Sequence, residues 1–229
     1  MRKLLLGGAA IAAITLAVEG PAMAAPPPVY NWTGCYIGGN VGGGWAHKDF
    51  STELNGVFTG HGPQNASAIV GGLQGGCDYQ SGMWVFGVRG MFDWTDMHGA
   101  GPFIAGKGYT TQIPWFATAT GRVGFLTQPN LQIFVTGGGA WVRDHHVFFD
   151  PGPFEFASVT RSGALVGVGA EWMWSPFWSI TIEYDYMSFG NKAVVFTNIF
   201  GNTGTEHIKQ DVQAVLVSLN YRFGTWGGR

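Results

Sequence analysis

The sequence predicts an all-β fold, an eight-stranded antiparallel up-and-down transmembrane β-barrel with short periplasmic turns and four long extracellular loops. Composition is the first observation behind this prediction: of 229 residues, 38 are glycine, 15% are aromatic and only 11% are charged. A soluble domain carries about 25% charged residues and about 7% glycine. The second observation is a set of eight segments in which apolar and polar residues alternate. The third is that short and long connections between these segments follow one another strictly.

The composition also excludes several classes of protein. Ten Trp, 17 Phe and 7 Tyr supply far more apolar surface than a disordered tract contains. The glycines follow no three-residue period, which excludes a collagen-like chain. The formal net charge of −2 creates no overall basic field, so no nucleic-acid partner is expected.

The N-terminus has the pattern of a secretory signal peptide. Arg2 and Lys3 precede the apolar run 4–18, and small residues follow at Ala22 and Ala24, which predicts cleavage between Ala24 and Ala25. The apolar run is shorter than the about 20 residues of a spanning helix, which argues against the alternative of a membrane anchor. The expected organisation is a signal peptide over 1–24, a periplasmic lead-in over 25–33, the barrel over 34–223 and a C-terminal tail over 224–229.

Each of the eight segments places apolar side chains on one face and polar side chains or glycine on the other. Their lengths equal or slightly exceed the about 9–11 residues of a tilted membrane-crossing strand. They cover residues 34–46, 67–79, 83–94, 109–125, 131–142, 162–174, 178–189 and 211–223. In chain order, the apolar faces carry Cys35, Ile37, Val41 and Trp45; Ile69, Leu73, Cys77 and Tyr79; Trp84, Phe86, Val88, Phe92 and Trp94; Trp115, Ala117, Ala119 and Val123; Ile133, Val135 and Trp141; Ala164, Val166, Val168, Trp172 and Trp174; Ile180, Ile182, Tyr184 and Tyr186; and Val215, Val217, Leu219, Tyr221 and Phe223.

The connections between the segments alternate in length. Three are short, at 80–82, 126–130 and 175–177, and four are long, at 47–66, 95–108, 143–161 and 190–210. Outer-membrane barrels have this arrangement, with short periplasmic turns and longer outside loops. The chain is therefore expected in the outer membrane.

Tryptophans lie near both ends of the predicted strands, as in the two aromatic girdles of a membrane barrel. In the alternative, a soluble barrel, the polar faces would form the outer surface. That surface would need about 25–35% charged residues to stay dispersed, and the chain has 11% in total. The tryptophans beside the long loops are Trp45, Trp94, Trp115 and Trp141, and those beside the short turns are Trp84, Trp172, Trp174 and Trp178.

Four motifs resemble the outer-membrane immunogenic proteins, a family of small porin-like barrels of alphaproteobacteria. They are NWTGCYIGG at 31–39, GGLQGGCDYQ at 71–80, the stretch 178–190 containing EYDY, and LNYRFG at 219–224. The resemblance implies an outer-membrane location, a structural and surface-antigen role and, in some members, haemin binding. Two features depart from the family pattern: Arg89 stands where relatives often have an acid, and the chain continues past the aromatic Phe223.

Charged residues on the polar faces are expected inside the barrel. Eight strands leave an interior just wide enough for side chains to fill, and charges there need partners. The sequence therefore predicts a polar plug with ion pairs; the alternative is a narrow selective path or a proton relay. The predicted plug consists of Asp78, Arg89, Asp93, Arg122, Glu171, Glu183, Asp185 and Arg222.

All six histidines fall in the predicted long loops, where they are candidate ligands for a metal or haem iron. They are His47, His61, His98, His145, His146 and His207. The alternative is that they are ordinary polar loop residues, because no His-x-x-x-His spacing occurs. His145, Ser158 and Glu155 share a loop, but their spacing does not specify a catalytic triad, so no enzyme activity and no cofactor are expected.

The two cysteines predict a disulfide between Cys35 and Cys77. Export places both thiols in an oxidising compartment. In an antiparallel hairpin that opposes Cys35 to Cys77, Trp45 opposes Ser67, and both cysteines lie on the outward face at the periplasmic end. The alternative is a pair of reduced thiols facing lipid.

Together these observations predict a structural, surface-exposed barrel with at most limited permeation of small solutes. Haem or metal binding through the histidines is the first alternative, and a lipid-modifying enzyme is a less favoured one. The expected partners are outer-membrane lipid, lipopolysaccharide and the barrel-assembly machinery, which would contact the strand ending at Phe223.

Overall fold

The computed structural model describes residues 29–54, 57–100, 108–149, 155–197 and 203–224. The predicted signal peptide, its cleavage site at Ala24 and Ala25, and the tail beyond Gly224 lie outside the described residues. The described chain forms eight strands: β1 (Gly34–Leu54), β2 (Val57–Ser81), β3 (Trp84–Ala100), β4 (Gly108–Gln128), β5 (Leu131–Phe149), β6 (Glu155–Ser175), β7 (Trp178–Thr197) and β8 (Thr203–Phe223).

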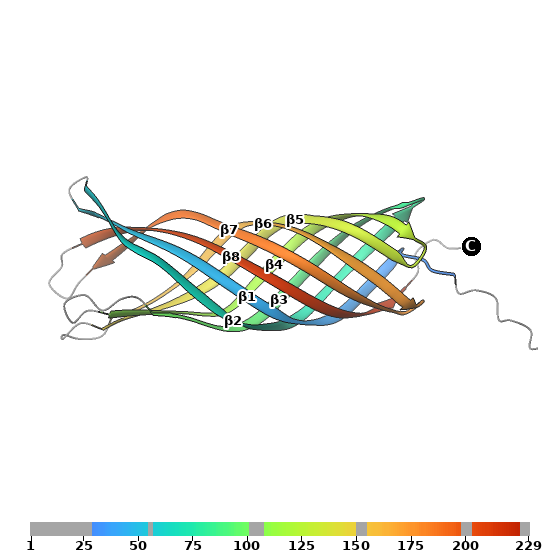
Figure 1. The fold of residues 1–229 in the computed structure, drawn as a ribbon, viewed down its shortest axis with the longest axis horizontal. Coiled ribbons are helices and arrows are strands. Elements are labelled where there is room, and N and C mark those ends of the chain that lie inside the picture. The colour runs from blue at the N-terminus through green and yellow to red at the C-terminus, as the bar shows by residue number, and fades with distance from the viewer. Residues whose placement is uncertain (1–28, 55–56, 101–107, 150–154, 198–202, 225–229) are drawn as a thin grey trace, which may run out of the picture.

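The strands close into one antiparallel barrel in chain order (Figure 1). Each strand pairs with its neighbours in sequence, and β1 also pairs with β8 from Cys35 opposite Phe223 to Glu53 opposite Thr205. Closure removes the unpaired edges that an open sheet would expose. The predicted eight-stranded up-and-down barrel is confirmed.

Three tight turns join the strands at one end, which we call the turn end. The residues between strands are Gly82-Met83, Pro129-Asn130 and Pro176-Phe177. Gly82 has a φ of 61°, the left-handed region that favours glycine. The short connections were therefore predicted at the right places.

The opposite end, which we call the hairpin end, differs from the prediction of four long loops. The pairing of β1 with β2 continues to Leu54 opposite Val57, and that of β5 with β6 continues to Phe148 opposite Glu155. Most residues of 47–66, 95–108, 143–161 and 190–210 are thus strand. The alternation of apolar and polar residues stops in these segments, but backbone hydrogen bonds do not depend on it. A strand with no lipid on one face can extend without that pattern.

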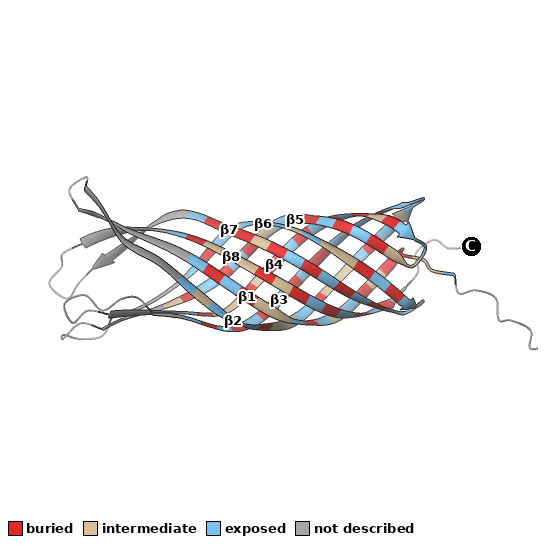
Figure 2. Cartoon of the chain, viewed as in Figure 1, coloured by how far each residue is buried: buried red, intermediate tan, exposed pale blue. Residues whose placement is uncertain are grey.

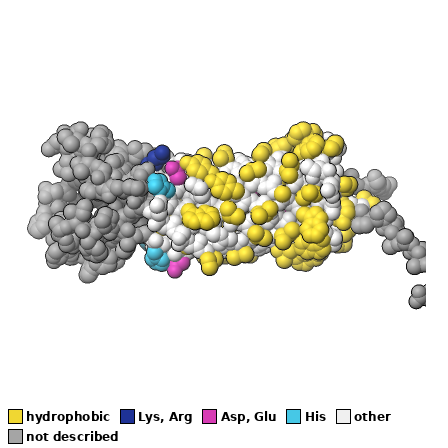
Figure 3. Space-filling model, viewed as in Figure 1, with side chains coloured by type: hydrophobic (Ala, Val, Ile, Leu, Met, Phe, Trp, Pro, Cys, Tyr) yellow, Lys and Arg dark blue, Asp and Glu magenta, His cyan; other side chains and the backbone are white. Residues whose placement is uncertain are grey.

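Alternation of the two faces is confirmed along the membrane part of every strand (Figure 2). Outward side chains are apolar and exposed, as in Val88 at 65% and Val168 at 54%, while the neighbouring Arg89 is buried. Figure 3 shows hydrophobic side chains over the described middle and turn end, and a narrow band with charged and histidine side chains beside the grey residues. This belt is the surface expected against lipid.

Glycine allows the narrow barrel to close at inward positions. A Cβ at Gly42 would collide with the carbonyl oxygen of Val215 on β8, and one at Gly72 would collide with the carbonyl oxygen of Phe92 on β3. At such close approaches of two backbones only glycine fits.

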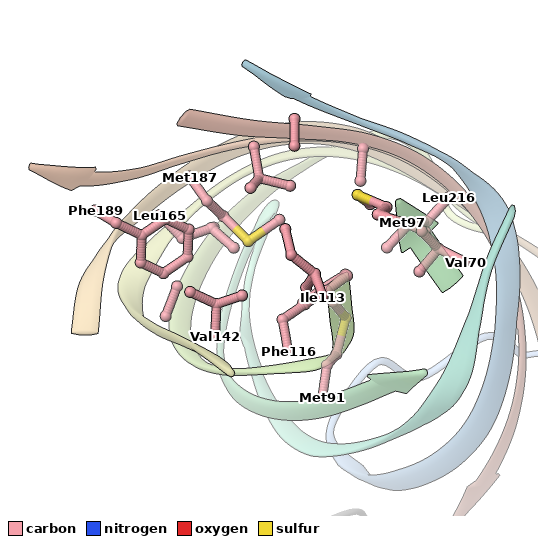
Figure 4. Packing of buried hydrophobic residues seen from close by; sticks show 14 residues of the cluster. Val70, Met91, Met97, Ile113, Phe116, Val142, Leu165, Met187, Phe189 and Leu216 are labelled. Atoms are coloured by element: carbon pink, nitrogen blue, oxygen red, sulfur yellow. The ribbon is translucent and has the colours of Figure 1, made fainter. Parts of the chain in front are cut away.

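The plug prediction implied a polar interior throughout, but part of the interior is apolar. Fourteen buried apolar residues, which we call the apolar cluster, fill the lumen toward the hairpin end. Figure 4 shows how they converge from the surrounding strands. They escaped prediction because only the charged inward residues were assigned to the interior. The members are Ala46, Val70, Met91, Met97, Ile113, Phe116, Ala140, Val142, Leu165, Met187, Phe189, Val212, Ala214 and Leu216.

The end of the predicted lead-in closes the turn end of the barrel. Trp32 is fully buried and packs with Val85, Leu126 and Met173. Its indole Nε1 donates a hydrogen bond to the carbonyl oxygen of Pro129 at 3.1 Å, and its backbone N–H donates to Gln80 Oε1 at 3.0 Å. Residues before β1 therefore belong to the packed structure.

Candidate functional site

Four of the predicted plug residues meet in one buried group, which we call the ion network: Asp78, Arg122, Glu171 and Arg222. They come from β2, β4, β6 and β8, so every second strand contributes one. Arg122 donates to Asp78 Oδ1 at 2.8 Å and to Glu171 Oε2 at 2.8 Å. Arg222 donates to Asp78 Oδ2 at 2.6 Å and lies 3.4 Å from Glu171 Oε1. Two positive and two negative charges balance within the lumen.

Neutral groups add further hydrogen bonds in and around the ion network. Glu171 accepts from Ser179 Oγ at 2.6 Å and from Gln132 Nε2 at 3.0 Å. Asn220 Nδ2 donates to Thr181 Oγ1 at 3.1 Å. These polar residues were not predicted as site residues, although their inward position in the alternating pattern would have identified them.

Aromatic rings flank both arginines of the ion network. The Arg122 guanidinium lies 5.0 Å from the centre of the Tyr36 ring and 5.3 Å from that of Phe134. Arg222 lies 4.8 Å from the Trp32 ring and donates to the Trp32 carbonyl oxygen at 3.0 Å. Cation–π contacts of this kind strengthen when water is excluded. The ion network is thereby packed against the Trp32 closure.

A second ion pair lies nearer the middle of the barrel. Arg89 donates to Glu183 through two bonds, of 2.5 Å and 2.7 Å, the bidentate geometry that makes such pairs strong. Asp93 and Asp185 are both fully buried, yet neither forms an ion pair within the described chain. The predicted plug residues therefore divide into the ion network, one separate pair and two buried acids outside any pair.

A third buried pair was missed by the sequence reasoning. Arg161 on β6 lies 3.2 Å from Asp144 on β5, and both side chains are fully buried. Both residues fall in the predicted loop 143–161, so no inward face was assigned to them. The strand extension places them inside the barrel beyond the apolar cluster.

The histidines lie on strands rather than in loops. His47 Nδ1 is 2.6 Å from Asn65 Oδ1, and His98 Nδ1 is 3.3 Å from Asp96 Oδ1. His98 and His145 both oppose Gln112 in the sheet register, one from each side. The side chains of His61, His146 and His207 lie outside the described residues. Among the side chains that are described, no three His, Cys, Asp or Glu residues gather as a metal site.

The register also brings two of the three catalytic candidates opposite each other. His145 on β5 opposes Ser158 on β6, while Glu155 opposes Phe148. The side chains of Ser158 and Glu155 lie outside the described residues. The backbone therefore places this group at the hairpin end.

Cys35 and Cys77 face each other across β1 and β2 and are joined by a disulfide. The same register opposes Trp45 to Ser67. Cys77 is exposed on the outer face and Cys35 is half-buried beside it. The disulfide links the first hairpin close to the turn end.

Among the described residues, no helix is long and apolar enough to cross a membrane. A family model described as "Outer membrane protein beta-barrel domain" matches residues 9–223. The 31 kDa outer-membrane immunogenic proteins of Brucella melitensis and Brucella suis are each 30% identical to this chain over 215 residues, which covers 87% of both sequences.

Solved structures share the fold at low sequence identity. The outer membrane protein OprG of Pseudomonas aeruginosa has a TM-score of 0.51 and 14% identity, covering 86% of this chain and 99% of that one. The outer membrane protease OmpT of Escherichia coli has a TM-score of 0.54 and 10% identity, covering 85% and 98%. At these identities the likeness shows the barrel fold alone.

Proposed function

We propose that this chain, which belongs to the outer membrane protein beta-barrel domain family, acts as a closed barrel that presents hairpins at the cell surface and does not conduct. The cell outer membrane is its location. The Brucella relatives are named outer-membrane immunogenic proteins. We infer a surface role for this chain from that name and from the hairpins described below.

The filled lumen is the observation that carries the proposal. From the turn end inward, the barrel contains the Trp32 closure, then the ion network, then the Arg89–Glu183 pair, and then the apolar cluster. Water and ions would have to cross the layer of buried ion pairs and then the layer that contains the apolar cluster. Hydrophobic constrictions block conduction by dewetting. A path for solutes would require both layers to rearrange.

The long strands support the surface role. After Trp45, β1 continues for nine residues to Leu54. At about 3.3 Å per residue and a tilt of about 40°, this carries the backbone roughly 20 Å or more beyond the girdle. Three further hairpins extend at the same end (Figure 1). Such projections would be the first part of the protein that an antibody or a partner meets.

Assembly in the membrane would use the last strand. Phe223 ends β8, is exposed on the outer face and opposes Cys35 on β1, where the barrel closes. This position supports the proposed contact with the barrel-assembly machinery. The described histidines supply no observation that favours haem or metal binding over the surface role.

Conductance in planar lipid bilayers tests the proposal. We expect no stable single-channel steps from the refolded wild-type protein. A variant with Phe116→Ala and Leu165→Ala, which thins the apolar cluster, should show more frequent openings. The outward Val168→Ala is the matched control and should behave as wild type. Steady single-channel current steps from wild-type protein that has native electrophoretic mobility would refute the closed-barrel function.

A further inference from the structure

Arg143 is an exposed cation at the boundary between the apolar belt and the hairpins. It lies on the outward face of β5, two residues after Trp141. In the sheet register it opposes Trp115 on β4 and Thr160 on β6. Trp115 in turn opposes Trp94 on β3. The guanidinium therefore lies at the outer edge of the tryptophan girdle, at the depth of lipid headgroups.

No salt bridge of Arg143 is found among the described residues. Of the lysines and arginines whose side chains are described, only Arg143 and Lys209 are exposed. The other four are buried, and each pairs with at least one carboxylate. The described part of the chain offers Arg143 no ion pair. The acid on this part of the face, Asp96, lies 3.3 Å from His98 Nδ1 and accepts a hydrogen bond from Gln112 Nε2 at 3.2 Å.

Further polar groups lie in the next row toward the hairpin end. Gln112 opposes both His98 and His145 in the register, so these three residues occupy consecutive strands. His98 and Gln112 are exposed, and His145 is partly buried on the same outward face. A ligand held by Arg143 would thus have amide and imidazole groups beside it on its solvent side, with the Thr160 position next to it on β6.

On the lipid side of Arg143 a row of small residues crosses four strands. Gly90, Ala119, Gly139 and Ala164 are opposed in sequence from β3 to β6. A Cβ at Gly90 would have its nearest neighbour at 3.9 Å, so packing does not require glycine there. The Trp141 indole lies over Gly139: a Cβ built at Gly139 would be 3.0 Å from Cη2 of that ring. Beside this indole, Gly90, Ala119 and Ala164 present no side chain larger than a methyl group to the lipid.

We propose that this face of β3–β6 binds a phosphorylated lipid of the outer leaflet, with Arg143 contacting the phosphate and the small-residue row contacting an acyl chain. Charge complementarity selects the occupant, because an arginine fork matches a phosphate and the described side chains provide this cation with no carboxylate. The tryptophans on either side suit the region between headgroup and hydrocarbon. The site rests on the proposed orientation, with the hairpins outside the cell.

Native mass spectrometry of the refolded full chain in detergent tests the site. The probe is lipid A carrying its phosphates, with dephosphorylated lipid A and inorganic phosphate as comparison probes. Arg143→Gln should lower retention of phosphorylated lipid A about tenfold or more, because a hydrogen bond to a charged group is lost. Lys209→Gln, which removes the other exposed cation, is the matched control and should bind as wild type. Heat-modified mobility on gels verifies that each variant is folded.

Three results would overturn the site: equal binding by Arg143→Gln and wild type, equal binding of dephosphorylated lipid A, or inorganic phosphate that displaces the lipid at similar concentration. Equal losses in Arg143→Gln and Lys209→Gln would also overturn it, because they would indicate a general charge effect. Conductance separates this site from the closed-barrel function. A lipid site that fails in a non-conducting protein refutes only the site, and a conducting wild type with a normal lipid site refutes only the function.

Discussion

Replacing Glu171 by Gln should destabilise the barrel far more than a matched change at another buried acid. Glu171 is fully buried and accepts hydrogen bonds from Arg122 at 2.8 Å and from Ser179 at 2.6 Å. Gln keeps the shape but removes the negative charge, which leaves the ion network with a net charge of +1. It also directs an NH2 group toward donors. Breaking a buried ion pair in this way costs about 3–5 kcal/mol.

Asp185→Asn is the matched control, because Asp185 is equally buried and forms no ion pair in the described chain. Removing this carboxylate should cost less than about 1 kcal/mol or stabilise the fold, since a buried acid outside any ion pair is itself unfavourable. The assay is urea unfolding of protein refolded into lipid vesicles, followed by tryptophan fluorescence and gel mobility. The double variant Glu171→Gln with Arg122→Gln should lose less than the sum of its single changes. Equal losses for Glu171→Gln and Asp185→Asn would refute the ion network as a source of stability.

Three further predictions follow from the outer surface and the first hairpin. Val88→Arg, on the lipid face near mid-strand, should lower the free energy of unfolding by about 2–4 kcal/mol, and an Arg at the interfacial position Trp45 should cost much less. Refolding into lipid vesicles measures both variants. An unaffected Val88→Arg protein would contradict the assignment of faces. Protease added to intact cells should cut, if anywhere, within 47–66, 95–108, 143–161 or 190–210, whereas cleavage near Gly82 would reverse the orientation. Thiol labelling of denatured, unreduced protein should find no free thiol, and two labelled thiols would disprove the disulfide. Changing both cysteines to Ser should lower the free energy of unfolding by about 3–4 kcal/mol, because the disulfide closes a loop of roughly 40 residues.

Much of the barrel could be predicted because a membrane imposes a local pattern. In β3, lipid requires Phe86 and Val88 to be apolar and outward, so Arg89 between them has to face inward. The same counting predicted the opposition of Cys35 and Cys77, since the register of one hairpin depends only on its own two strands. These features need information from a short stretch of chain.

The extent of the strands could not be predicted in this way. Beyond Trp45 and Trp141 no lipid selects the outward side chain, so the sequence of β1 and β5 loses its alternation while the backbone pairing continues. For the same reason Asp144 and Arg161 were assigned to a loop, although the structure buries them as a pair. The alternation of apolar and polar residues therefore marks the part of a strand that lies in the bilayer, not the full length of the strand.

Fold class, strand number, the two faces and the turn end could be predicted, because each depends on residues that are neighbours along the chain or across one hairpin. Which inward residues meet depends on the closed barrel and could not be predicted from local pattern. Asp78, Arg122, Glu171 and Arg222 come from strands that are not adjacent, and their meeting depends on the stagger that accumulates around the closed barrel. Trp32 at the turn end and Leu165 in the apolar cluster become core residues for the same reason: a lumen exists only after all eight strands have closed around it.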